Sequence, residues 1–194
     1  MHVSPSHDDQ KWMRSALVMA SKGDGLTAPN PSVGCVIVAD NGLIGRGVTA
    51  SGGRPHAETE ALADAGQAAN GATAYVTLEP CSHHGQTPPC TQALIDAGVA
   101  HVVAAIQDND RRVDGNGFAM LRAAGIQVTT GVLADQAALD HAGFFMRNGL
   151  GRPWVTLKLA NSFDGRIATA TGDSQWITGP DARRLVHGMR AQHD

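Results

Sequence analysis

The run Thr77-Leu78-Glu79-Pro80-Cys81 contains the last two residues of a strand-like segment, 74–78, and the three residues that follow it. Cys90 then opens a helical segment. Upstream, His56-Ala57-Glu58 opens another helical segment. A positive helix terminus favours a thiolate over a thiol, and a bound metal does the same. The arrangement therefore predicts that two helix N-termini converge on one metal ion, held by one imidazole and two thiolates.

Outward from this stretch, the apolar residues alternate between helical and strand periodicity. Two β-branched runs, 33–39 and 43–49, flank Asn41-Gly42, which is a strong hairpin signal. The other expected elements are, in chain order, a helix over 8–23, a helix over 56–66, a strand over 74–78, a helix over 91–97, a strand over 101–106, a helix over 117–124, a strand over 126–130 and a helix over 134–147. This order predicts an α/β domain whose sheet is covered by helices on both faces.

A break in composition follows at Asn148-Gly149-Leu150-Gly151-Arg152-Pro153. We therefore expect a first domain over residues 1–147, a linker over 148–153 and a second piece over 154–194. The second piece holds a strand-like run over 154–160 and a helix that starts near Pro180. About 40 residues are too few for an independent core.

Composition narrows the class of protein. The chain has 194 residues, of which 42% are hydrophobic and 17% charged, so it can bury a core and is not a disordered protein. A net charge of −3 and an aromatic content of 4% argue against a nucleic-acid partner. No apolar run reaches the ~18–20 residues of a membrane helix, and the polar N-terminus lacks the apolar segment of a secretory signal. Because three cysteines provide no disulfide framework, we expect a cytoplasmic protein with no membrane partner.

The cluster of His56, Cys81 and Cys90 fits zinc. Three protein ligands leave a fourth position for water, which is typical of a catalytic site. Glu58 is expected to act as a general acid/base rather than as a ligand. Taken singly, the cysteines would be buried, inert thiols. Together the residues match the zinc-deaminase signature H-x-E…P-C-x-x-C, except that eight residues, 82–89, separate the two cysteines here.

The whole run from Thr77 to Cys90 closely resembles the deaminase domain of the bifunctional riboflavin biosynthesis deaminase/reductase family. Pro29-Asn30-Pro31-Ser32-Val33-Gly34 and Pro55-His56-Ala57-Glu58 match the same family. The resemblance spans nearly the whole chain. It implies a cytidine-deaminase-like three-layer α/β/α sandwich, in agreement with the order of elements above.

The resemblance also implies a substrate and a reaction. The substrate would be 2,5-diamino-6-(5-phosphoribosylamino)pyrimidin-4-one, a pyrimidine ribose phosphate, and zinc would be the cofactor of its hydrolytic deamination at ring carbon 2. Glu58 would pass a proton to the ring nitrogen and then to the leaving amine. Asn30 is implied to hydrogen-bond the substrate, under a loop over 82–87. His83 or His84 is a candidate contact for the ribose phosphate, the alternative being a solvated loop histidine.

Other groups that could carry chemistry are expected to be structural. Cys35 falls in the middle of an apolar strand, which predicts a buried, inert thiol. His101 opens a strand and is expected to be a packed or edge residue. His141 falls on a helix face and is expected to be solvated.

The runs 155–166 and 172–179 resemble the opening of the same family's reductase domain, which is dihydrofolate-reductase-like and uses NADPH. Because most of that domain would lie beyond Asp194, we expect the chain to hold only a truncated start of it and to lack reductase activity. The resemblance implies the following contacts: Ala160 and Trp176 with NADP, and Lys158, Ser174 and Arg190 with the substrate.

Two other functions need to be distinguished from this one. A nucleoside or tRNA deaminase would share the fold, although the low charge, the sparse aromatics and the long loop between the cysteines speak against a nucleic acid. A zinc ion that only stabilised the fold would have no use for Glu58. We expect a small-molecule substrate and a homo-oligomeric assembly.

Overall fold

The computed structural model describes residues 6–85, 88–110 and 113–193. Within these residues one mixed sheet has the strand order β2-β1-β3-β4-β5. Its strands are β1 (Gly34–Ala39), β2 (Gly42–Val48), β3 (Thr73–Val76), β4 (His101–Ala104) and β5 (Gln127–Thr130). The predicted hairpin is confirmed, since β1 is antiparallel to β2 and Ala39 pairs with Gly42. β1 is also antiparallel to β3, whereas β3, β4 and β5 are parallel.

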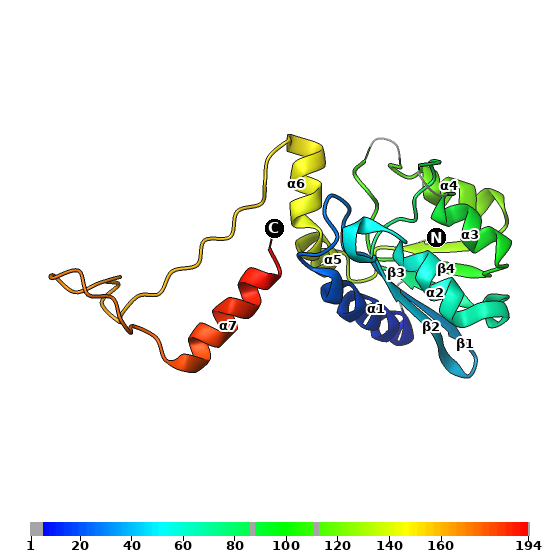
Figure 1. Ribbon diagram of the computed structural model, residues 1–194. Coiled ribbons are helices and arrows are strands. Elements are labelled where there is room, and N and C mark those ends of the chain that lie inside the picture. The colour runs from blue at the N-terminus through cyan, green and yellow to red at the C-terminus, as the bar shows by residue number, and fades with distance from the viewer. Residues whose placement is uncertain (1–5, 86–87, 111–112, 194) are drawn as a thin grey trace.

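Helices cover both faces of the sheet, because side chains along each inner strand alternate between two apolar clusters. On β1, Cys35 and Ile37 belong to one cluster and Val36 to the other. The first cluster is completed by α2 (Ala57–Ala65), α3 (Cys90–Asp96) and α4 (Asn116–Ala123), and the second by α1 (His7–Ala20) and α5 (Ala134–Asp140). This arrangement, seen in Figure 1, confirms the predicted three-layer α/β/α sandwich.

The helix α2 lies very close to β2, because glycines on the strand leave room for the helix backbone. A Cβ atom on Gly47 would lie only 2.1 Å from the carbonyl oxygen of Ala57, and one on Gly45 only 2.4 Å from that of Ala61. Any larger residue would push the helix away from the sheet. The first turn of α2, which follows His56, is therefore held against the sheet.

Short 3-10 helices and two further α-helices complete the structure. The 3-10 helices are η1 (Ser21–Gly23), η2 (Ser51–Gly53) and η3 (Gly66–Ala69), and the α-helices are α6 (Ala142–Leu150) and α7 (Pro180–Ala191). The start of α7 agrees with the expected helix at Pro180. None of the helices in the described part of the chain is both long and apolar enough to cross a membrane.

Two sequence-based expectations are wrong. The single helix expected over 134–147 is broken at His141, which ends α5 and caps α6. The strand expected over 154–160 is absent from these residues, all of which the structure describes. A strand requires a neighbour to satisfy its backbone groups, and no described strand pairs with this run.

The chain after α6 leaves the sandwich as an extended segment and returns through α7, as Figure 1 shows. The returning end is tied to the departing segment by a contact of 3.2 Å between Nε2 of His193 and Oγ1 of Thr156. Because α6 runs to Leu150, it includes the first residues of the expected linker. The domain boundary at 147 stays a prediction.

Candidate active site

The site begins where α2 begins. His56 precedes the first residue of the helix and has extended backbone angles (φ −77°, ψ 158°). Glu58 lies in the first turn and is buried, with 4% of its surface exposed. Because His56 stands outside the helix, its side chain and that of Glu58 both reach one cavity, as the sequence predicts.

The two cysteines are brought together by the junction of β3 and α3. Cys81 lies beyond the carboxyl end of β3, and Cys90 is the first residue of α3. The backbone N–H of Cys90 donates to Sγ of Cys81 at 3.3 Å, and the N–H of Thr91 donates to the Cys81 carbonyl at 3.2 Å. The N–H of Cys90, at the start of α3, is thus directed at the sulfur of Cys81, where it favours the thiolate.

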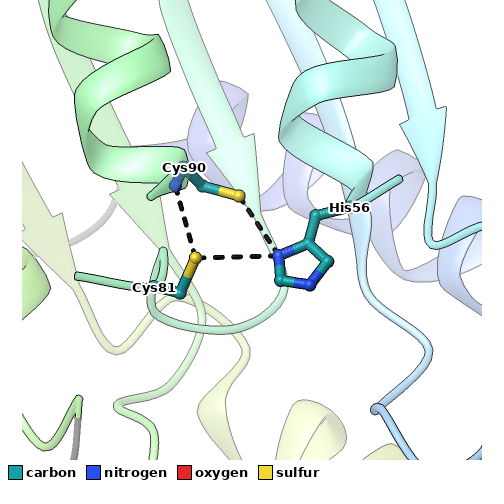
Figure 2. Close-up of side chains that lie close together, drawn as sticks. All are labelled: His56, Cys81 and Cys90. Atoms are coloured by element: carbon teal, nitrogen blue, oxygen red, sulfur yellow. Dashed lines mark hydrogen bonds between the residues drawn. The ribbon is translucent and has the colours of Figure 1, made fainter. Parts of the chain in front are cut away.

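Figure 2 shows the side chains of His56, Cys81 and Cys90 pointing toward one another. Nδ1 of His56 lies 3.3 Å from Sγ of Cys90 and 3.7 Å from Sγ of Cys81. All three ligand atoms lie within 4.8 Å of one another. Tetrahedral zinc with ordinary bond lengths would separate a nitrogen and a sulfur ligand by about 3.6 Å. The donor set and its spacing therefore fit a zinc ion with three protein ligands.

The buried groups around this cluster change one another's proton affinity. A hydrogen bond from Cys90 lowers the pKa of Cys81 to about 4, while the hydrogen bond to Cys81 and burial raise the pKa of Cys90. The hydrogen bond to Cys81 also raises the pKa of His56. Burial, together with the nearby charge of Cys81, raises the pKa of Glu58 to about 7. A carboxyl group with that pKa can both accept and donate a proton at neutral pH.

A cavity of about 340 Å³ opens over the cluster. Its walls come from five parts of the chain, namely the segments 29–33, 49–58 and 78–83, the residues Asp108, Asp110 and Val113, and α6. A volume of this size suits a small molecule.

Asn30 and His83 both line the cavity. Asn30 is held in place by a hydrogen bond from its Nδ2 to the carbonyl oxygen of Gly53 at 2.8 Å. Nδ1 of His83 is buried and has no hydrogen-bond partner among the described residues. His84 is exposed and does not line the cavity, and residues 86–87 of the expected covering loop lie outside the described residues. A buried ring nitrogen that has no partner among the described residues is available to a water or to a ligand atom.

Glu79 is a cavity residue that the sequence reasoning missed. Its buried carboxylate accepts hydrogen bonds from the backbone N–H groups of Asp108, Gly115, Gly117 and Phe118, at 2.9 to 3.3 Å. It thereby anchors the loop after β4 and the start of α4 beside Cys81. The signal was present, because a carboxylate at the end of a buried strand requires several donors.

The residues expected to serve a second site also lie together. A separate cavity of about 400 Å³ in the C-terminal segment is lined by Lys158, Ala160, Ser174, Trp176 and Arg190. Among the described residues, it shares no lining residue with the first cavity.

The sequence predicts no chemical role for one cysteine and two histidines outside the site, and the structure shows the burial of each. Cys35 is fully buried, as predicted. His101 is half-buried at the start of β4 and contacts Oγ1 of Thr129 at 3.0 Å. The prediction for His141 is wrong, because only 2% of its surface is exposed and Nε2 lies 3.3 Å from Oγ1 of Thr77. Burial lowers the pKa of His141 to about 4, so the imidazole is neutral at pH 7.

Two family models match the chain. Residues 6–106 match the family model described as the cytidine and deoxycytidylate deaminase zinc-binding region. Residues 153–194 match the model of the RibD C-terminal domain. The first match includes His56, Cys81 and Cys90, and the second includes all five residues named for the second cavity.

Individual relatives extend over both parts. The riboflavin biosynthesis protein RibD of Haemophilus influenzae is 54% identical over 187 residues, which cover 96% of this chain and 50% of the relative. The structure of Acinetobacter baumannii RibD, form 1, is 51% identical with a TM-score of 0.86, over 95% of this chain and 52% of that one. The Thermotoga maritima diaminohydroxyphosphoribosylaminopyrimidine deaminase/5-amino-6-(5-phosphoribosylamino)uracil reductase is 42% identical with a TM-score of 0.89, over 95% of this chain and 53% of that one. The chain thus spans about half the length of these relatives.

Proposed function

Because the chain belongs to the family of the cytidine and deoxycytidylate deaminase zinc-binding region, we propose that it deaminates a pyrimidine of riboflavin biosynthesis by zinc-dependent hydrolysis. The substrate we propose is 2,5-diamino-6-(5-phosphoribosylamino)pyrimidin-4-one. This choice of substrate is supported by the similarity of the chain to riboflavin biosynthesis proteins over 95% or more of its length.

One structural observation carries the chemical part of the proposal. A histidine and two cysteines lie at zinc-ligand spacing, and His56 and Cys81 of this cluster line a small cavity together with Glu58. Glu58 is buried, and its pKa is about 7. A zinc ion that only stabilised the fold would need neither the cavity nor Glu58. This combination therefore favours a catalytic centre over a structural one.

In the proposed mechanism, His56, Cys81 and Cys90 hold the zinc. When bound, zinc acts as a Lewis acid that lowers the pKa of a coordinated water toward neutrality. Glu58 accepts a proton from water as the water oxygen adds to ring carbon 2, and it delivers that proton to the ring nitrogen. It then moves the proton of the new hydroxyl group to the amino group, which leaves carbon 2 as ammonia while the carbonyl forms. Its buried position keeps this proton from exchanging freely with solvent.

Asn30 and His83 would bind the substrate beside this centre. The amide of Asn30 is fixed by Gly53 through Nδ2, so its oxygen is left to accept a hydrogen bond from an amino group of the ring. The buried Nδ1 of His83 supplies a further polar contact. Two observations support both assignments: the two residues line the cavity, and the sequence resembles the riboflavin biosynthesis deaminase/reductase family.

For the C-terminal segment we propose parts of a second, NADPH-dependent site. Ala160 and Trp176 would contact NADP, while Lys158, Ser174 and Arg190 would contact the sugar-bearing substrate. Support comes from their shared cavity and from the match of residues 153–194 to the RibD C-terminal domain.

The test is ammonia release by the zinc-loaded chain, with the diaminopyrimidine ribose phosphate as substrate and cytidine as the control. We expect ammonia from the former and little from cytidine. Faster release from cytidine would favour a nucleoside deaminase on the same fold, and no release from either would overturn the proposal.

A further inference from the structure

Charge is distributed unevenly along the cavity over the cysteine cluster. Glu58, Glu79 and Asp108 line it and are each less than 9% exposed, so its inner part is acidic. A fourth acidic residue of the wall, Asp110, is half-buried. Of the described residues on its wall, the arginines are Arg54, which is half-buried, and Arg147, which is exposed. An anionic group on a ligand would be repelled by the buried carboxylates and attracted to the two arginines.

Arg147 is held at the cavity wall by the packing of α6. The helix starts after the buried His141, and its backbone accepts a hydrogen bond at Phe145 from Nδ2 of Asn109 at 3.0 Å. Arg147 lies in the last turn, where Nη2 donates to the carbonyl oxygen of Pro29 and the guanidinium lies 5.7 Å from the centre of the Phe144 ring. These contacts orient the guanidinium but use few of its five N–H donors.

Arg54 belongs to the same part of the wall. Its neighbour Gly53 accepts a hydrogen bond from the side chain of Asn30. The residue before Asn30, Pro29, accepts the hydrogen bond from Arg147. A Cβ atom on Gly85 would lie 3.2 Å from Nη2 of Arg54, so this guanidinium lies against the loop after Cys81. One network of contacts thus connects the segments that carry both arginines.

We propose that Arg147, assisted by Arg54, binds the phosphate monoester of the substrate, while the pyrimidine lies over the acidic inner part. This assignment rests on the proposed function, since it supplies the ligand that carries a phosphate. Guanidinium groups bind phosphate oxygens through two parallel hydrogen bonds, which fixes orientation as well as adding affinity. Arg147 would then determine specificity for the phosphorylated substrate over the same pyrimidine without its phosphate.

The kinetic test compares these two substrates in the Arg147→Gln chain, loaded with zinc. We expect KM for the phosphorylated substrate to rise roughly 10- to 100-fold, the equivalent of one charge-assisted contact, with kcat almost unchanged. KM for the dephosphorylated riboside should change less than about twofold, because it has no group for Arg147 to bind. Equal effects on both substrates, or none on either, would overturn the assignment.

Arg122 provides a matched control. It also lies in the last turn of its helix, α4, and its guanidinium is 5.8 Å from the ring centre of Phe118. It does not line the cavity. Arg122→Gln should therefore leave KM for both substrates unchanged, and a rise equal to that of Arg147→Gln would show a non-specific effect of charge.

Binding of ribose 5-phosphate, measured by calorimetry, separates this subsite from the deamination itself. The parent chain should bind this probe, and Arg147→Gln should bind it roughly tenfold or more weakly. If the parent chain deaminates neither pyrimidine yet shows this difference, the proposed reaction fails and the phosphate subsite stands. If the parent and the variant bind the probe equally, the subsite assignment fails.

Discussion

On β4, at the centre of the sandwich, Val103 is fully buried, whereas Val155 in the segment after α6 is 78% exposed. The same contrast holds for larger side chains, since Leu121 of α4 is fully buried and Leu157 is 79% exposed. Both regions carry motifs of the same family, and both gather the residues that those motifs predict around a cavity.

The difference between the regions lies in what supports each cavity. In the sandwich, the site residues follow a paired strand or open a helix that packs on the sheet. Residues 154–179, all of which the structure describes, form no helix or strand, so among the described residues α7 is the one regular element that lines the second cavity. A motif can therefore predict which residues meet, but the buried apolar surface behind them determines the free energy that holds them together.

The largest effect should come from removing a ligand in the well-supported region. Cys90→Ala takes away one of three proposed zinc ligands, so zinc affinity should fall more than roughly 100-fold and ammonia release should be lost. Zinc content after dialysis and ammonia release measure these effects. Cys35→Ala removes the third cysteine, which is buried in the core and does not belong to the ligand cluster, and should retain the metal. A Cys90→Ala chain with one zinc and full activity would refute the ligand assignment.

The buried His141 should make the stability of the sandwich depend on pH. Burial lowers its pKa to about 4 from an ordinary value of 6.5, so between these values the unfolded chain binds one more proton than the folded chain. The free energy of unfolding should therefore fall by about 3 kcal/mol as the pH drops from 6.5 to 4. Urea denaturation across this range measures the loss.

His141→Gln is the matched comparison, because glutamine can still hydrogen-bond Thr77 but does not titrate. Other histidines and carboxylates titrate alike in both chains, so the difference between their pH profiles isolates His141. Parallel profiles for the two chains would mean that the imidazole titrates normally, in conflict with its burial.

A smaller change in the free energy of unfolding is expected from two matched valine-to-alanine variants, one in each region. Val103→Ala should lower the free energy of unfolding by roughly 2 kcal/mol, since it removes two buried methyl groups and leaves a small cavity. Val155→Ala makes the same chemical change at an exposed position and should alter it by less than about 0.5 kcal/mol. Chemical denaturation of both variants gives the two values. Similar losses would show that the segment after α6 packs as tightly as the sandwich.

Local patterns account for most of what the sequence predicts correctly. The hairpin between β1 and β2 follows from two β-branched runs around Asn41-Gly42, and the layers follow from strand–helix alternation. The cluster of His56, Cys81 and Cys90 follows from residue types with strong chemical preferences at element boundaries. The hairpin signal lies within a few residues of the hairpin, whereas the cluster joins residues up to 34 positions apart and is predicted from the chemistry of its side chains.

The errors come from interactions between distant parts of the chain. His141 is buried because Thr77, far from it in sequence, lies beside it. The break between α5 and α6 falls at the same residue, and helical periodicity does not reveal it. Residues 154–160 have the composition of a strand, but strand formation depends on a pairing partner, and the described strands pair elsewhere.

The central claim is that Glu58 moves protons beside a zinc ion that His56, Cys81 and Cys90 hold. It is tested most directly by ammonia release from the diaminopyrimidine ribose phosphate, measured together with zinc content in Glu58→Gln. Our account predicts a rate lower by roughly 10²- to 10⁴-fold with zinc content unchanged. Undiminished ammonia release by this variant, with zinc bound, would contradict it.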